Sequence, residues 1–125
     1  MGAAGFYGPA SGQYLGCARG TLTGGAAWDD LTSASFRSLT HATAAALEAS
    51  LKPLFFHILN KGTANLFWKL VADAAANEAT TLRPYIEGND DHAFEVSGGE
   101  AVNNTLSITG TAGGAYVILG WFRDP

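Results

Sequence analysis

The sequence predicts an all-β fold, a single antiparallel β-sandwich preceded by an extended glycine-rich arm. From about Ser33 onward, short apolar stretches alternate with turn-forming residues at intervals of about ten residues, which is the pattern of sandwiches and barrels. Before that point, eight of the sixteen glycines fall within residues 1–25. We therefore expect an extended N-terminal arm at residues 1–30 and a β-sandwich domain at residues 31–125.

The composition restricts the kinds of partner this chain can have. Its 125 residues suffice for one ordinary hydrophobic core. Only 14% of the residues are charged, against about 25% in a typical soluble protein, so we expect much of the surface to contact other protein. The net charge is −4 and the seven Lys and Arg residues are scattered singly. Direct binding to nucleic acid is therefore not expected, because it requires a basic patch that neutralises phosphates.

The single cysteine and the length of the apolar runs indicate in which cellular compartment the protein is made. Cys17 has no partner for an intrachain disulfide, so nothing in the sequence marks an oxidising compartment. The longest apolar runs, such as Ala115–Leu119, are far shorter than a membrane span, and no signal-peptide pattern opens the chain. We expect a protein that is made in the cytoplasm and has no membrane partner.

The arm expected at residues 1–30 combines glycines with large aromatic side chains. Residues 1–28 carry one charge, at Arg19. Aromatic residues exposed on a mobile tail are unfavourable unless a partner surface covers them, so we interpret the segment as an arm that docks on a neighbouring subunit. A disordered tail is the alternative.

The clearest strands in the body are expected around residue 60. Leu54–Asn60 and Thr63–Ala72 are rich in apolar and aromatic residues. Asn60, Lys61 and Gly62 between them tolerate a positive φ, so we predict that the two strands form a hairpin joined by a tight turn.

Further strands are expected on the same reasoning. They lie at Phe36–Ala42, Thr81–Glu87, His92–Ser97, Thr105–Thr109 and Ala115–Phe122. In the last of these, the side chains on both faces of the strand are apolar. We therefore expect both faces to be covered, one by the opposite sheet and one by something outside, such as another subunit. The alanine-rich stretch Thr43–Lys52 has helical spacing and is either one short helix or a strand and turn.

No motif in the sequence indicates catalysis, a cofactor or a metal. Ser, His and carboxylate residues occur, but none lies in a recognisable nucleophile motif. His57 lies inside an apolar strand, where a hydrogen-bonded histidine of a core or interface is expected. The acidic residues of the 87–100 stretch are interpreted as a solvated turn, with a calcium site as the alternative. The other two histidines are His41 and His92, too far apart in the sequence to suggest a metal site.

Aromatic and arginine residues near the two ends of the chain are the candidate interface residues, because such side chains are enriched at the centres of protein interfaces. The Trp121–Arg123 end of the last strand either caps the sandwich or meets a partner. The candidates are Phe6, Tyr7, Tyr14, Leu15, Trp28, Trp121, Phe122 and Arg123.

The body also shows a family resemblance in the order of its strand and turn segments. These segments are Leu39-Thr40-His41-Ala42-Thr43-Ala44 with Leu47, Phe56-His57-Ile58-Leu59-Asn60-Lys61-Gly62-Thr63-Ala64, Arg83-Pro84-Tyr85-Ile86, Phe94-Glu95-Val96, and Leu106-Ser107-Ile108-Thr109-Gly110-Thr111-Ala112-Gly113-Gly114-Ala115-Tyr116-Val117. In this order they resemble the small β-sandwich structural proteins of tailed-bacteriophage virions, of the head decoration or cement type.

That resemblance implies a jelly-roll-like sandwich that binds the outer surface of a capsid as a dimer or trimer. The implied partner is the major capsid protein or another virion protein, and the resemblance carries no catalytic residue. The alternative is a tail-fibre module that binds a receptor or carbohydrate. Such a module would present a Trp or Tyr face in an open groove with polar neighbours. A small β-sandwich enzyme is a third, weaker alternative.

Overall fold

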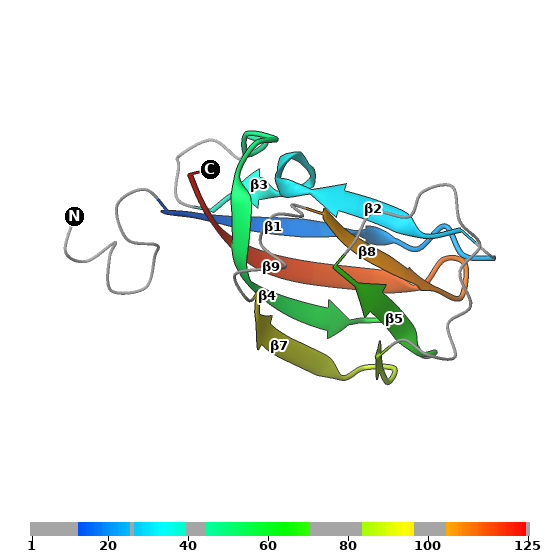
Figure 1. Cartoon of the computed structure of the whole chain (residues 1–125). Coiled ribbons are helices and arrows are strands. Elements are labelled where there is room, and N and C mark those ends of the chain that lie inside the picture. Colours follow the sequence, from blue (N-terminus) through cyan, green and yellow to red (C-terminus); the bar gives the residue numbers. More distant parts are fainter. Residues whose placement is uncertain (1–12, 26, 40–44, 71–83, 97–104, 125) are drawn as a thin grey trace.

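A computed structural model describes residues 13–25, 27–39, 45–70, 84–96 and 105–124, which form two antiparallel sheets packed face to face (Figure 1). The first sheet has the strand order β3-β1-β9-β4-β7 and the second β2-β8-β5-β6. The strands are β1 (Gln13–Thr21), β2 (Asp29–Thr32), β3 (Arg37–Ser38), β4 (Lys52–Asn60), β5 (Leu66–Lys69), β6 (Tyr85–Ile86), β7 (Asp91–Glu95), β8 (Thr105–Gly110) and β9 (Ala115–Arg123). One 3-10 turn, η1 (Ser33–Ser35), follows β2.

Strands from the two halves of the chain pair in a nested order. β1 pairs with β9, β2 with β8, β4 with β7 and β5 with β6, all antiparallel. β9 also pairs with β4, and β8 with β5, which completes the two sheets. This arrangement is a jelly roll, with the two-residue β3 added at one edge. The predicted all-β sandwich is confirmed.

The hairpin expected around residue 60 is wrong, although both of its strands exist. β4 lies in the first sheet and β5 in the second, so the connection crosses between layers. Asn60, which ends β4, stabilises this connection: its side-chain amide donates to the carbonyls of Ala64 (2.8 Å), Ile86 (2.8 Å) and Glu87 (3.1 Å). Its side-chain oxygen accepts from the Gly62 N–H at 3.0 Å. Neither Asn60, Lys61 nor Gly62 has a positive φ.

The other predicted strands are found with different lengths. β8 and β9 each run one residue beyond the predicted ends, whereas β6 and β3 are only two residues long. The alanine-rich stretch is not helical where it is described: Ala46 forms an isolated bridge with Arg37, and β4 begins at Lys52. Its residues 43–44, like residues 71–80, lie outside the described residues.

The predicted arm at residues 1–30 is wrong from Gln13 onward. β1 pairs with β9 along all nine of its residues, and β2 is a strand of the second sheet. The glycines of this region serve packing. Gly16 faces Gly120 across the sheet, and a Cβ on Gly16 would lie 2.8 Å from the Cβ of Phe36. A Cβ on Gly120 would lie 2.7 Å from the ring of Phe122. Residues 1–12 lie outside the described residues.

Three phenylalanines form the centre of the core. The Phe36 ring lies 5.0 Å from Phe122 and 5.9 Å from Phe56, and Phe56 lies 5.8 Å from Phe122, measured between centroids. Each of the three is essentially buried, and burying such a side chain contributes about 1.5–3 kcal/mol to the free energy of unfolding. The core therefore forms between the inner faces of the two sheets.

An aromatic stack closes the side of the sandwich between β5 and β7. The Trp68 ring lies 4.1 Å from that of Phe94 with an interplanar angle of 11°. The His92 ring lies 5.5 Å from Phe94 in a similar orientation. Packing against the core accounts for Trp68. No helix in the described part of the chain is long and apolar enough to cross a membrane.

Candidate functional site: the outer face of the five-stranded sheet

The first sheet has an inner face that is buried in the core and an outer face that is apolar. Along β9, Tyr116, Ile118, Gly120 and Phe122 are buried, and Val117, Leu119 and Trp121 are half-buried. This alternation follows from the two-residue period of a strand. Because β9 lies between β1 and β4, its half-buried side chains occupy the middle of the sheet.

The strand register extends this surface over four strands. One row across β1, β9, β4 and β7 reads Leu15, Trp121, Phe55 and Glu95, the next reads Cys17, Leu119, His57 and Ala93, and the third reads Arg19, Val117, Leu59 and Asp91. We call the side chains of Leu15, Cys17, Phe55, His57, Leu59, Val117, Leu119 and Trp121 the outer face. Apolar side chains thus fill its centre, and its acidic side chains lie only on the edge strand β7.

The outer side of the second sheet is polar by comparison. The Ser107 hydroxyl donates to the Asp30 carboxylate, and the Thr109 hydroxyl donates to the Ala27 carbonyl at 2.7 Å. Lys69 is 3% exposed, and its Nζ lies 4.5 Å from the ring centroid of Trp28. The polar groups of this sheet are therefore satisfied within the chain, whereas the first sheet presents an apolar surface.

A side-chain hydrogen bond joins the outer face to the acidic edge of the sheet. His57 Nε2 and Asp91 Oδ2 are 2.6 Å apart and join β4 to the edge strand β7. The predicted hydrogen bond of His57 is therefore present, and it links a side chain of the outer face to the acidic edge.

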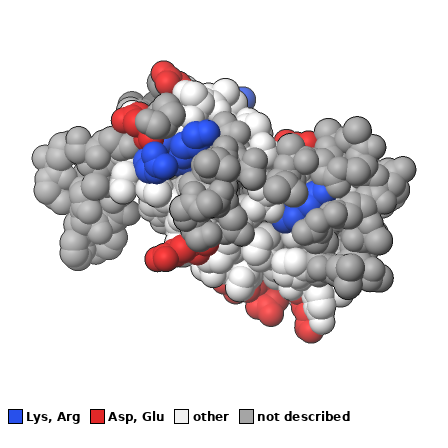
Figure 2. Space-filling view, in the orientation of Figure 1, with Lys and Arg blue, Asp and Glu red and all other residues white. Residues whose placement is uncertain are grey.

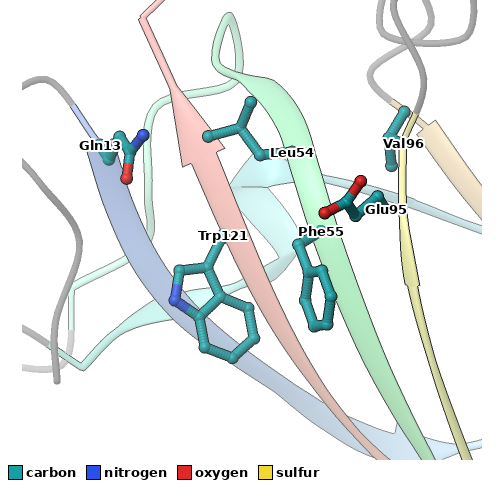
Figure 3. Close-up of a pocket in the computed structure, with 6 residues that line it drawn as sticks. All are labelled: Gln13, Leu54, Phe55, Glu95, Val96 and Trp121. Carbon is teal, nitrogen blue, oxygen red and sulfur yellow. The ribbon is translucent and has the colours of Figure 1, made fainter.

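A pocket of about 570 Å³ lies at one end of the outer face (Figure 3). In Figure 3 the Trp121 and Phe55 rings stand side by side, with Gln13 of β1 on one flank and Glu95 of β7 on the other. The two rings meet edge to face, with centroids 5.2 Å apart and an interplanar angle of 87°. The remaining lining residues are Leu54 and Val96.

An irregularity in β4 shapes this pocket. The register between β4 and β9 shifts between Pro53 and Phe55, so Leu54 is an extra residue in the strand. Proline lacks an N–H and cannot donate to the ladder, which makes a bulge favourable at this point. The Leu54 carbonyl instead accepts from the Val96 N–H at 3.0 Å, which brings the end of β7 to the pocket.

The structure separates the residues proposed for the interface into three groups. Leu15 and Trp121 lie on the outer face, and Arg123 is exposed at the end of β9. Trp28 is 5% exposed and Phe122 is 1% exposed, so both rings lie inside this chain and present no surface to a partner. Phe6 and Tyr7 lie outside the described residues.

Tyr14 packs partly against the core and reaches the end of the chain. Its hydroxyl donates to Asp124 Oδ1 at 3.2 Å. This hydrogen bond, together with the negative charge of Asp124, raises the pKa of Tyr14 above its usual value. Tyr14 thus fixes the chain terminus beside β1.

Sequence reasoning found the outer face only in part: it expected something outside to cover the last strand, which carries Val117 and Leu119, but it did not add β4 to that surface. Phe55, Leu59, Val117 and Leu119 were not among the predicted interface residues. The signal that could have found them is the two-residue alternation in β4 and β9, but the neighbours of each strand depend on a register that spacing alone does not define.

The acidic stretch does not gather ligands in the part of the chain that is described. There, no three His, Cys, Asp or Glu side chains come together in a group that could hold a metal ion. Glu100 lies outside the described residues. In Figure 2 acidic side chains gather at the lower rim, over β7 and the turn before it, and wide areas of the described surface carry no charge.

A second pocket, of about 370 Å³, lies beside the acidic turn that precedes β7. It is lined by Trp68, by Tyr85, which is 55% exposed, and by polar residues. The polar lining residues include Glu87, Asp90, Asp91 and His92.

Comparisons with known proteins give likenesses in structure. No protein-family model matches the sequence, and no curated protein matches it. A chain from Bacillus endospore appendages, which form a family of disulfide-linked pili, is similar with a TM-score of 0.51 and 14% identity, over 90% of this chain and 88% of that one. Two structures of the tobacco streak virus coat protein, one of them a dimer, are similar at 10% identity. The dimer has a TM-score of 0.46 over 93% of this chain and 89% of that one. The other has a TM-score of 0.47 over 91% and 88%. The likeness to the pilus chain supports the sandwich fold.

Proposed function

We propose that this chain is a non-enzymatic structural protein of a virion, of the decoration or cement type. It binds the outer surface of a capsid, formed by the major capsid protein or another virion protein, and stabilises the contacts between capsomers. The observation that carries this proposal is the apolar outer face across β1, β9, β4 and β7. Apolar surface of this kind is characteristic of interaction sites, and the low content of charge agrees with it.

The stabilisation of the capsid by a bound decoration protein follows from mass action. A protein that binds the assembled shell more tightly than its separate parts shifts the equilibrium toward the shell. Self-association of the chain as a dimer or trimer multiplies such contacts by symmetry and provides avidity. The pilus chain with this fold also belongs to an assembled appendage, which supports a role in assembly.

The number of cysteines limits how copies of this chain can be linked. Cys17 is the one cysteine, and it lies half-buried on the outer face. One cysteine per chain allows one intermolecular disulfide, so disulfides can join copies of this chain only in pairs. Larger assemblies of it therefore depend on non-covalent contacts.

Immunogold electron microscopy tests the proposal. An antibody raised against this chain is applied to virus particles purified from a culture that produces it. We expect label over the capsid surface. Label confined to tail fibres would favour the receptor-binding alternative, and particles without label would overturn the proposal.

One observation favours the alternative, a module that binds a receptor or carbohydrate. The second pocket places Tyr85, 55% exposed, beside the carboxylates of Glu87 and Asp90. Aromatic rings beside polar groups are suited to sugars. Glycan-array binding that is lost in Tyr85→Ala and kept in Leu119→Glu would support this alternative. Absence of binding to any glycan would count against it.

A further inference from the structure

We propose that the pocket at the end of the outer face binds the Phe6-Tyr7 pair of the N-terminal segment from a second copy of this chain. The inference rests on the proposed function and deepens it, because it names the partner of one end of the outer face. Three observations carry it: where the pocket lies, what lines it and how long the preceding segment is.

The pocket lies at the point where the described chain begins. Gln13, the first residue of β1, is one of its lining residues, and it pairs with Arg123 near the end of β9 (Figure 3). Twelve residues precede Gln13. An extended chain spans about 3.3–3.6 Å per residue, so Tyr7 can reach about 20 Å beyond Gln13. A neighbouring molecule that approaches this end of the sheet is within that reach.

The chemistry of the segment matches that of the pocket. Residues 1–12 contain no Lys, Arg, Asp or Glu, and Phe6 and Tyr7 are their two aromatic residues. The pocket offers the rings of Phe55 and Trp121 and the apolar side chains of Leu54 and Val96. Aromatic rings pack well edge to face or offset against such rings. The Glu95 carboxylate at the rim is an acceptor for a tyrosine hydroxyl.

The geometry favours a second copy over the same chain. Five residues, 8–12, join Tyr7 to Gln13, and Gln13 itself lines the pocket. To enter its own pocket, the segment would have to reverse its direction within these residues. A segment that continues beyond the sheet into a neighbour needs no such reversal, and two copies can exchange segments by two-fold symmetry.

Disulfide trapping between two different variants tests the inference. Both variants and the control are made in the same Cys17→Ser background, so that the native thiol cannot form the disulfide. One carries Tyr7→Cys and a mass tag, and the other carries Glu95→Cys. A heterodimer between them forms rapidly only if the segment of one copy reaches the pocket of another. Thr63→Cys, an exposed position beyond the opposite end of β4, replaces Glu95→Cys as the matched control.

We expect the Tyr7→Cys and Glu95→Cys heterodimer to form about tenfold faster than the control pair in a glutathione buffer. Equal rates would overturn the inference. A single chain with both Tyr7→Cys and Glu95→Cys provides a second test. Rapid closure within that chain, seen as a monomer without free thiols, would show docking on its own pocket and would also overturn it.

The trapping and immunogold experiments together distinguish failure of this inference from failure of the proposed function. Immunogold label on capsids together with equal trapping rates would reject the docked segment and leave the proposed function standing. Unlabelled particles with fast heterodimer trapping would reject the proposed function and leave the exchange of segments standing.

Discussion

A single side chain at Asn60 holds the crossing between the two sheets. Asn60 is 2% exposed, and its amide bonds to the carbonyls of Ala64, Ile86 and Glu87. Buried carbonyls that lose a donor are costly, at about 1–3 kcal/mol for an unsatisfied group. Asn60 therefore stabilises the connection between β4 and β5.

We predict that Asn60→Ala lowers the free energy of unfolding by about 2–3 kcal/mol, because three carbonyls lose their shared donor. Urea denaturation monitored by tryptophan fluorescence measures the change. The exposed Asn65 supplies the matched control, and Asn65→Ala is expected to change stability by less than about 0.5 kcal/mol. Equal transition midpoints for Asn60→Ala and the wild type would contradict the role given to Asn60.

The buried hydroxyl of Tyr116 makes the free energy of unfolding depend on pH in the alkaline range. Burial, with a smaller contribution from the charge of Asp29, raises the pKa of the Tyr116 hydroxyl above its ordinary value. The unfolded chain loses this proton near pH 10, while the folded chain still holds it. The protonated Tyr116 therefore contributes fully to the free energy of unfolding below the ordinary pKa. This contribution decreases as pH rises from the ordinary pKa to the folded-state pKa.

We predict that Tyr116→Phe flattens the fall in the free energy of unfolding above about pH 10. The other groups that titrate in this range remain in the variant, so the difference between the two proteins isolates Tyr116. Urea titrations at half-unit intervals from pH 8 to about pH 11 measure it. Parallel slopes for the two proteins would show that the buried hydroxyl does not control this dependence.

At the scale of elements, β1 belongs to the sandwich and not to an arm outside it. β1 is hydrogen-bonded to β9 along its whole length and carries β3 on its other side. Its inner residues, including Gly16 and Ala18, pack under the core. The sandwich therefore already includes Gln13.

We predict different results for two truncations. Removal of residues 2–12 is expected to change the free energy of unfolding by less than about 0.5 kcal/mol. Removal of residues 2–21 takes away β1 and is expected to abolish the cooperative transition, because β9 and the rings of Phe36 and Phe122 lose their cover. Circular dichroism during urea denaturation distinguishes the two. A cooperative transition after removal of residues 2–21 would contradict the place given to β1.

Particular elements show what the sequence could and could not predict. β8 was predictable because Leu106 and Ile108 recur with the two-residue period, and β9 because a continuous apolar run follows the glycine-rich turn at residues 110–114. β1 was not, because its glycines resemble those of a linker until the side chains of Phe36, Leu47 and Tyr116 that lie against Gly16 and Gly20 are known. The hairpin failed because Asn60, Lys61 and Gly62 suit a tight turn as well as a crossing between sheets. The pocket around Trp121 depends on the register of four strands and on the bulge at Leu54.

At the scale of the whole molecule, the two sheets differ in what they present outward. The second sheet satisfies its polar side chains within the chain, as Ser107 and Thr109 show. The first sheet presents Val117, Leu119 and Trp121 in its middle. A molecule with one apolar side can bury it only against another molecule, so association through the first sheet is the central claim.

Sedimentation velocity over a range of protein concentrations tests this claim most directly. The wild type is compared with Leu119→Glu, which places a charge in the middle of the outer face. Tyr85→Glu, at an exposed position of the second sheet, is the matched control, and circular dichroism verifies that all three proteins are folded. We predict that the wild type and Tyr85→Glu form dimers or trimers, and that Leu119→Glu remains monomeric at concentrations at least about tenfold higher, since a buried unpaired charge is strongly unfavourable. Identical association of the wild type and Leu119→Glu would contradict the assignment of the outer face as the assembly surface.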